Sequence, residues 1–201
     1  MKPYSGACEQ NRDPILAVLK ELLTTESATA TSTVLEVGSG TGQHAVYFAE
    51  KLPTVIWQCS DQQQYHAGIQ AWLDEAKLPN VLPPINLNVS EDTWPTNEFD
   101  LLYSANVMHI MHWQNVVDLF AKGSKCIKSG GMMVCYGPFN YEGEYTSASN
   151  AQFDQSLRAR DPQSGIRNFE DLQQLADEAG LTFIRDYEMP ANNRILVWQK
   201  T

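Results

Sequence analysis

Segments typical of β-strands alternate with segments typical of helices through most of this 201-residue chain. Short apolar runs predict strands at residues 33–37, 55–59, 81–87, 99–104 and 132–136. Apolar residues at helical spacing predict helices at residues 44–52, 65–76 and 113–127. Because strands joined through helices run parallel, the alternation predicts an α/β fold, with a doubly wound, mostly parallel sheet and helices on both faces.

The chain before the first strand also has a helical pattern. Its apolar residues predict a helix over residues 14–23, with Pro14 in the first position and either Asn11 or Asp13 as the cap. A polar run at residues 24–33 is predicted to link this helix to the first strand.

The last third of the chain breaks the alternation. A helix predicted at residues 169–179 precedes strand candidates at 182–187 and 194–199, with only residues 188–193 between them. A parallel crossover needs about a dozen or more residues, so these strands are predicted to form an antiparallel hairpin that completes a seven-stranded, Rossmann-like sheet. Residues 137–161, rich in Tyr, Ser, Asn and Arg, are predicted to be an irregular segment of the kind that often forms a lid or binding loop.

Three glycines lie between the first strand candidate and the following helix. Gly38, Gly40 and Gly42, with Ser39 among them, remove Cβ atoms from the turn, so its N–H groups and the helix N-terminus can approach a ligand closely. A glycine loop alone is a weak signal, because it also serves as a tight strand-to-helix turn. Glu36 adds an acid that can accept hydrogen bonds from the loop or receive a ligand's ammonium group through water.

Polar residues at the ends of later strands suit an adenosine. Asp61 ends the second strand, where a carboxylate can hold both ribose hydroxyls, and Gln62 follows it. Asn88 and Val89 follow the third strand, where they would face the adenine amino group and ring, and Asn106 follows the fourth. Singly, Asp61 fits an exposed strand end or a helix cap, and Asn88 fits a simple turn. Together they predict an adenosine site at the carboxyl edge of the sheet.

Several segments carry a resemblance to a known family. These segments are residues 5–16, 40–46, 106–110 with Trp113, 137–139, 149–150, 153–154, 156–161 and 189–193. Through them the chain resembles, nearly end to end, the methyltransferase-like family catalogued as domain of unknown function 938. The resemblance implies a class I methyltransferase fold and S-adenosylmethionine as cofactor, and it does not fix an acceptor. The chain departs from the family at Gln10, where arginine is usual, at Gly6, where proline is common, and at His112.

We therefore expect an S-adenosylmethionine-dependent methyltransferase that acts on a small-molecule acceptor by in-line transfer. The expected cofactor residues are Glu36, Gly38, Ser39, Gly40, Gly42, Asp61, Gln62, Asn88, Val89 and Asn106. One alternative is a non-catalytic module that binds S-adenosylmethionine or S-adenosylhomocysteine and acts through protein partners. An oxidoreductase that binds a nicotinamide dinucleotide is a third hypothesis. Glu36 and the closing hairpin both argue against the oxidoreductase. Dehydrogenases continue the sheet with parallel units, whereas class I methyltransferases resemble this chain in closing the sheet with one antiparallel strand.

Methyl transfer from a sulfonium depends mainly on positioning, and a general base helps where the acceptor must lose a proton. His109, just beyond the fourth strand, is the candidate base, and a packed structural histidine is an equally good interpretation. The candidate acceptor-binding residues are Asn11, Trp113, Tyr136, Tyr141, Asn150 and Arg158. The aromatic residues could instead serve ordinary packing. Arg158 could instead belong to a solvated helix end with internal ion pairs. His109 and His112 form an HxxH pair without a third ligand nearby, so no metal is expected.

Charge and composition exclude several classes of function. The net charge of -10 and the pI of about 4.8 leave no large electropositive surface for phosphates, so a nucleic-acid partner is not expected. The first eight residues lack the apolar core of a secretion signal, and no stretch approaches the roughly 18 apolar residues of a membrane span. The four cysteines form no CxxC pair and are expected to be reduced. We expect a single domain over residues 1–201 and a cytoplasmic location.

Overall fold

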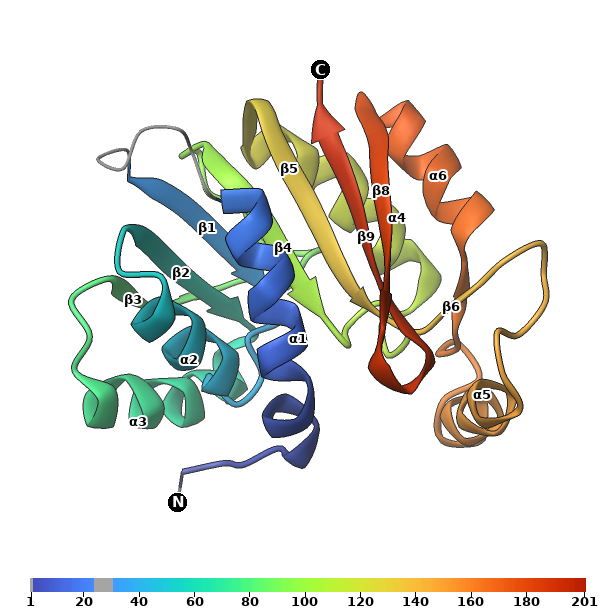
Figure 1. Ribbon diagram of the computed structural model, residues 1–201, viewed down its shortest axis with the longest axis horizontal. Coiled ribbons are helices and arrows are strands. Elements are labelled where there is room, and N and C mark those ends of the chain that lie inside the picture. The colour runs from blue at the N-terminus through green and yellow to red at the C-terminus, as the bar shows by residue number, and fades with distance from the viewer. Residues whose placement is uncertain (1, 24–30) are drawn as a thin grey trace.

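The computed structural model describes residues 2–23 and 31–201, in which helices cover both faces of a twisted sheet (Figure 1). The sheet has seven strands in the order β3-β2-β1-β4-β5-β9-β8. β9 is antiparallel to both of its neighbours, and the other adjacent pairs are parallel. The strands are β1 Ser32–Val37, β2 Val55–Asp61, β3 Val81–Asn86, β4 Phe99–Ala105, β5 Ile127–Gly137, β8 Leu181–Met189 and β9 Asn193–Lys200. The predicted α/β class, seven strands and closing antiparallel hairpin are confirmed.

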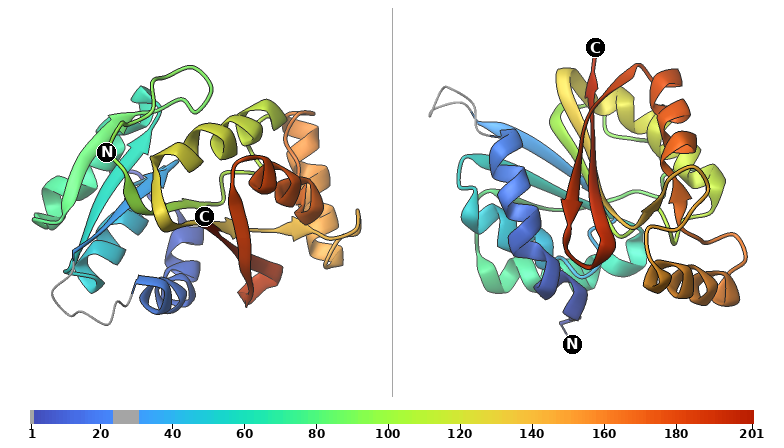
Figure 2. Two further views of the ribbon diagram at one scale, coloured as in Figure 1. Left: turned by 90° about the horizontal axis from the view of Figure 1, so that it is seen from above. Right: turned by 45° about the vertical axis from the view of Figure 1, so that its right-hand side comes forward.

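Each layer of helices packs against one face of the sheet and covers a separate hydrophobic core (Figure 2). α1, α2 and α3 cover one face around Phe48 and Trp57, and α4 and α6 cover the other around Phe120 and Trp198. α5 lies at the edge of the sheet where the parallel strands end (Figure 1). The helices are α1 Gly6–Leu23, α2 Gln43–Lys51, α3 His66–Ala76, α4 Trp113–Gly123, α5 Ala148–Arg160 and α6 Phe169–Glu178. The short elements are the 3-10 helices Gln63–Tyr65, Ser124–Cys126 and Pro190–Asn192, and β6 Phe139–Asn140, which pairs with β7 Arg167–Asn168.

The start predicted for the first helix is wrong. α1 begins at Gly6, and Pro14 lies inside the helix instead of in its first position. Proline lacks a backbone N–H, so the helix loses one hydrogen bond at this position. Contacts with α2 stabilise the helical turns that precede Pro14. Asn11 bonds to His44, and the Asp13 carboxylate accepts a hydrogen bond from Tyr47. Most of the predicted polar link at residues 24–33 lies outside the described residues.

The segment predicted to be irregular contains a complete helix. α5 begins after Ser147, whose hydroxyl accepts a hydrogen bond from the Asn150 N–H at 3.1 Å and caps the first turn. Its buried residues include Asn150 and Asp154 beside Leu157. Because this inward face is mostly polar, the apolar spacing that reveals other helices is missing.

The boundaries of the fifth strand also differ from the prediction. The helix expected to reach residue 127 ends at Gly123, and β5 begins at Ile127. The pairing of β4 with β5 shifts in register between Phe99 and Leu101, beside the glycines at 130–131. The glycines interrupt the apolar pattern and hide the first part of this strand. Among the described residues, no helix combines the length and the apolar character needed to cross a membrane.

Candidate active site

The three glycines after β1 serve different purposes. Gly38 has a φ of +78°, and a Cβ there would lie 2.7 Å from the Val107 Cγ2 atom, so no larger residue fits. Gly40 has a φ of +57°, and its missing Cβ would meet no atom within 4 Å. A Cβ on Gly42 would lie 3.0 Å from the Ile69 Cα atom, and this glycine lines neither of the hollows described below. The position of Gly42 therefore serves the close packing of α2 on α3, and its contact with a ligand stays a prediction.

Alanine substitutions should separate these roles. A side chain in the left-handed region costs roughly 1–2 kcal/mol at either position. In Gly42→Ala, the clash with Ile69 adds roughly 1–3 kcal/mol of overpacking, so we expect the larger loss of unfolding free energy there. In Gly40→Ala, the new methyl group faces open space, so we expect a smaller loss of stability and weaker binding of any ligand held by the loop. Urea unfolding and calorimetric titration with S-adenosylhomocysteine would measure both quantities, and equal effects of the two variants would contradict the assignment.

The ends of β2 and β3 form a hollow of about 560 Å³, here called the strand-end hollow. The Asp61 carboxylate, 9% exposed, accepts hydrogen bonds from the N–H groups of Gly40 and Gln62, both at 2.7 Å. The Asn88 side chain holds its own turn, accepting from the Ser90 N–H and donating to Glu91. Gln62, Val89 and Asn106 line the same hollow, as the sequence predicts. Tyr65, Val107 and Ile110 also line this hollow and were not predicted. Val107 and Ile110 belong to a segment that carries the family resemblance, whereas nothing in the residue pattern distinguishes Tyr65 from an ordinary helix residue.

Glu36 is a buried acid beside the glycine loop. It is 2% exposed, and its Oε2 atom accepts a hydrogen bond from the Trp57 indole N–H at 3.0 Å. Burial raises the pKa of Glu36 to about 7, although hydrogen bonds from Trp57 and Ser39 oppose this increase. A carboxylate that is costly to ionise without a partner is suited to receive a cationic group from a ligand.

The raised pKa of Glu36 predicts how ligand binding depends on pH. Because the pKa rises from an ordinary 4.5 to about 7, this proton stabilises the folded protein, and the stabilisation is lost as the pH rises from about 4.5 through 7. A ligand ammonium favours the carboxylate, so affinity for S-adenosylhomocysteine should increase between pH 5.5 and 7.5. Calorimetry across this range would measure the slope. Glu36→Gln should remove it, and an equal slope in this variant would exclude Glu36 as the titrating group.

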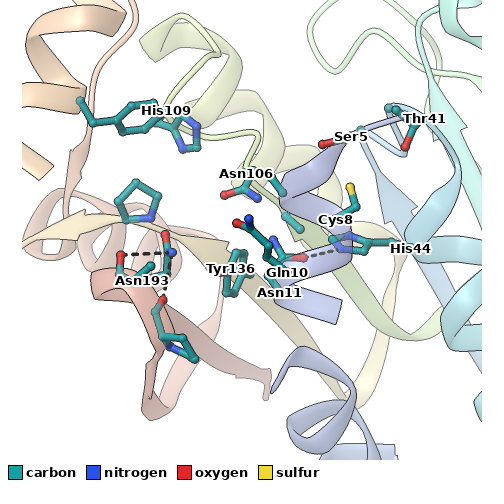
Figure 3. Close-up of a pocket in the computed structure, with 18 of the residues that line it drawn as sticks. Ser5, Cys8, Gln10, Asn11, Thr41, His44, Asn106, His109, Tyr136 and Asn193 are labelled. Atoms are coloured by element: carbon teal, nitrogen blue, oxygen red, sulfur yellow. Dashed lines mark hydrogen bonds between the residues drawn. The ribbon is translucent and has the colours of Figure 1, made fainter. Parts of the chain in front are cut away.

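A second hollow of about 660 Å³ begins on the other side of the glycine loop (Figure 3). Both hollows are lined by Gly38, Gly40, Ala105 and Asn106, so they meet at the ends of β1 and β4. Residues from α1, β5, α5 and the β8–β9 turn form the remaining walls, and it is here called the α1–α5 hollow. It is lined by Glu36, Ser39 and four of the residues predicted for the reaction, namely Asn11, His109, Tyr136 and Asn150.

His109 lies in the α1–α5 hollow as a neutral imidazole. The residue is 6% exposed, and burial lowers its pKa to about 4, with a smaller contribution from the positive charge of Arg167. The ring contacts Phe153 edge-on, with 5.2 Å between the centroids. No other described side chain forms a hydrogen bond with its ring nitrogens, which leaves them available to a molecule in the hollow.

A buried hydrogen-bond chain connects α2, α1 and β5. His44 Nε2 lies 2.7 Å from Asn11 Oδ1, and because an amide oxygen cannot donate, Nε2 carries the proton. Burial, the largest effect, lowers the pKa of His44 to about 4. Burial also raises the pKa of Tyr136, which a hydrogen bond from the Asn11 side chain opposes. The Tyr136 hydroxyl thus lies beside Asn11, and both residues line the same hollow.

Three of the predicted acceptor residues, Tyr141, Arg158 and Trp113, line neither hollow, and their contact with an acceptor stays a prediction. The Tyr141 hydroxyl donates to Asp186 at 2.6 Å, and its ring stacks on Phe169 between α6 and β8. Arg158 projects from α5 and pairs with Asp154 at 2.7 Å. Trp113 begins α4 as an exposed residue. For Tyr141, contacts with other elements hold the side chain away from the hollows.

The sequence analysis also missed several residues in the α1–α5 hollow. They are Ser5, Ala7, Cys8, Gln10, Thr41, His44, Pro138, Ser149, Phe153, Pro190, Ala191 and Asn193. Every one of them belongs to a segment that carries the family resemblance, so the resemblance was the available signal. His112, by contrast, lies at the strand-end hollow and pairs with Asp161 at 2.8 Å.

Solved structures with the same architecture include methyltransferases. An O-methyltransferase family 2 protein from Planctomyces limnophilus, in complex with apigenin, has a TM-score of 0.84 at 15% identity over 98% of this chain. The S-adenosylmethionine-dependent methyltransferase SibL has a TM-score of 0.79 at 20% identity over 96%. A structure of PigF with SAH has a TM-score of 0.75 at 14% identity over 93%. The chain spans 59%, 55% and 55% of these three proteins.

The fold is therefore the Rossmann-like fold of class I methyltransferases. Residues 2–200 match the family described as "Protein of unknown function (DUF938)", and the chain belongs to that family.

Proposed function

We propose that this protein is an S-adenosylmethionine-dependent methyltransferase that modifies a small-molecule acceptor. The observation that carries the proposal is the meeting of two hollows at Gly38 and Gly40, with Asp61 in one and both Glu36 and His109 in the other. Their volumes, about 560 and 660 Å³, are in the range of small-molecule sites. The PigF structure with SAH and the Planctomyces limnophilus structure with apigenin support the choice of cofactor and acceptor class.

The described residues fit this cofactor. Asp61 and Gln62 would hold the ribose hydroxyls, and Val89 would pack on the adenine ring. Asn88 would contact the adenine amino group after its side chain gives up a hydrogen bond to Ser90 or Glu91. Gly40 leaves open space where a Cβ would stand, and Glu36 is a buried acid in need of a cationic partner. When bound, S-adenosylmethionine supplies a methyl group activated by a sulfonium.

The acceptor would occupy the α1–α5 hollow. His109 is neutral at physiological pH, so it can accept a proton from an acceptor hydroxyl as the nucleophile forms. Phe153 and Pro138 would exclude water from the reacting groups. The Tyr136 hydroxyl, which lies beside Asn11, would fix the acceptor by a hydrogen bond. The whole activity would lie within one domain, in the cytoplasm.

Binding and turnover measurements test the proposal separately. Calorimetry should detect S-adenosylmethionine and S-adenosylhomocysteine, and a thermal-shift comparison should show no stabilisation by nicotinamide dinucleotides. A panel of hydroxylated small molecules with methyl-labelled cofactor should then reveal transfer. Binding without turnover across a broad panel would favour the non-catalytic module, and preference for the dinucleotide would favour the oxidoreductase.

A further inference from the structure

Among the residues that the structure describes, none that lines the α1–α5 hollow has a cationic side chain. Among the described residues that line it, Glu36 alone is an acid or a base with a formal charge at neutral pH, and the proposed function assigns it to the cofactor. Arg167, whose positive charge contributes to the lowered pKa of His109, does not line the hollow and is held by the backbone carbonyls of Met108, Met111 and Gln163. A carboxylate or phosphate in the hollow would lose its water without gaining a cation, which is costly.

The β8–β9 turn presents an amide oxygen to the hollow. The Asn193 side-chain nitrogen donates to the carbonyls of Pro190 at 3.2 Å and Ala191 at 3.4 Å (Figure 3). Carbonyls cannot donate, so these two bonds determine which end of the amide is the nitrogen. Ala191 and Asn192 adopt left-handed φ values of 58° and 57°, which gives the turn the shape that brings these carbonyls together.

Asn150 is held in the same way from α5. Its side-chain nitrogen donates to the Thr146 hydroxyl at 2.8 Å and to the Asn192 carbonyl at 3.0 Å. Both amide hydrogens are thus occupied, and no described residue donates to its oxygen. The hollow therefore has two amide oxygens, from Asn150 and Asn193, whose unfilled positions suit hydrogen-bond donors.

The remaining walls suit a ring with hydroxyl groups. Phe153, Pro138 and Pro190 form apolar walls, and Tyr136 offers a donor beside them. His109, as a neutral imidazole, can accept a hydrogen bond from an acceptor hydroxyl. A protonated amine would lose its water without gaining an anionic partner, because Glu36, the one acid among the described residues that line the hollow, is assigned to the cofactor.

We infer that the acceptor is an uncharged ring compound with hydroxyl groups, of the phenol class, and that the hollow excludes carboxylated and phosphorylated analogues. The inference rests on the proposed function, because it assumes that Glu36 and the strand-end hollow serve the cofactor. Two features would provide this selectivity. The amide oxygens of Asn150 and Asn193 favour hydroxyl donors, and a lining without a cation disfavours carboxylates and phosphates.

The test compares three probes that share one phenol ring. Methyl 4-hydroxybenzoate is neutral, 4-hydroxybenzoate is an anion, and tyramine is a cation at pH 7. Titration into the protein saturated with S-adenosylhomocysteine should give the neutral probe about tenfold or more tighter binding than either charged probe, a difference of about 1.4 kcal/mol. Equal or tighter binding of a charged probe would overturn the inference. Failure of S-adenosylhomocysteine to bind would instead refute the proposed function.

A charge-gain variant tests the cause of this selectivity. Gln10 is an exposed residue of α1 that lines the hollow, so Gln10→Arg adds a cation there. We expect affinity for 4-hydroxybenzoate to increase by about tenfold, while affinity for the neutral probe changes little. Gln155→Arg makes the same change on an exposed position of α5 outside the hollow and serves as the matched control. No gain in Gln10→Arg, or an equal gain in both variants, would contradict the role of the missing cation.

Discussion

Replacing His109 with alanine is expected to reduce kcat by about 10²–10⁴-fold, the usual contribution of a positioned general base. The imidazole lies in the α1–α5 hollow with no described side chain bonded to its nitrogens, and its pKa of about 4 keeps it neutral. With saturating cofactor, turnover in the wild type should therefore not depend on this group between pH 6 and 8. Single-turnover measurements with an identified phenol acceptor would determine the loss.

The same variant needs a control for packing, because His109 is buried against Phe153. Binding of S-adenosylhomocysteine and the thermal midpoint would show whether the fold and the cofactor site persist. Added imidazole should restore part of the turnover in His109→Ala if the ring acts chemically. Unchanged turnover in a folded variant would establish the alternative interpretation, in which His109 is a structural histidine.

Asp61→Ala is expected to weaken cofactor binding by a few kcal/mol, or about 10²-fold, because hydrogen bonds to a charged group contribute roughly 1.5–3 kcal/mol each. The carboxylate also accepts from the Gly40 N–H, so its loss would leave the glycine loop without this support. Calorimetric titration with S-adenosylhomocysteine measures the change. Unchanged affinity would show that the ribose is held elsewhere.

A matched aspartate lies at the opposite edge of the sheet. Asp100, near the beginning of β4, accepts from Thr33 and pairs with Lys128 at 2.8 Å. Asp100→Ala also removes a carboxylate bonded to backbone and side-chain donors, so it should lower stability. Because it lies away from both hollows, cofactor affinity should remain as in the wild type.

Much of the candidate site could be predicted because topology brings strand ends together. Glu36, Asp61 and Asn106 are distant in the chain, but each lies at or near the end of a parallel strand, and such ends meet at one edge. Gly42 shows the limit of this reasoning. The same residue type in the same loop serves ligand approach at Gly40 and helix packing at Gly42, and only the position of Ile69 distinguishes them.

By itself, the sequence determined the α/β class, the alternation of strands and helices over the first two thirds of the chain, and the closing hairpin. These features depend on local periodicity and on the length of each connection, which residues near one another in the chain decide. Tertiary structure alone decided which side chains form the α1–α5 hollow. Its walls come from α1, α5 and the β8–β9 turn, and they are joined by contacts such as Asn11 with His44 and Asn150 with Asn192. The residues in these contacts are distant in the chain, and α5 has a polar inward face, so no local pattern reveals their arrangement.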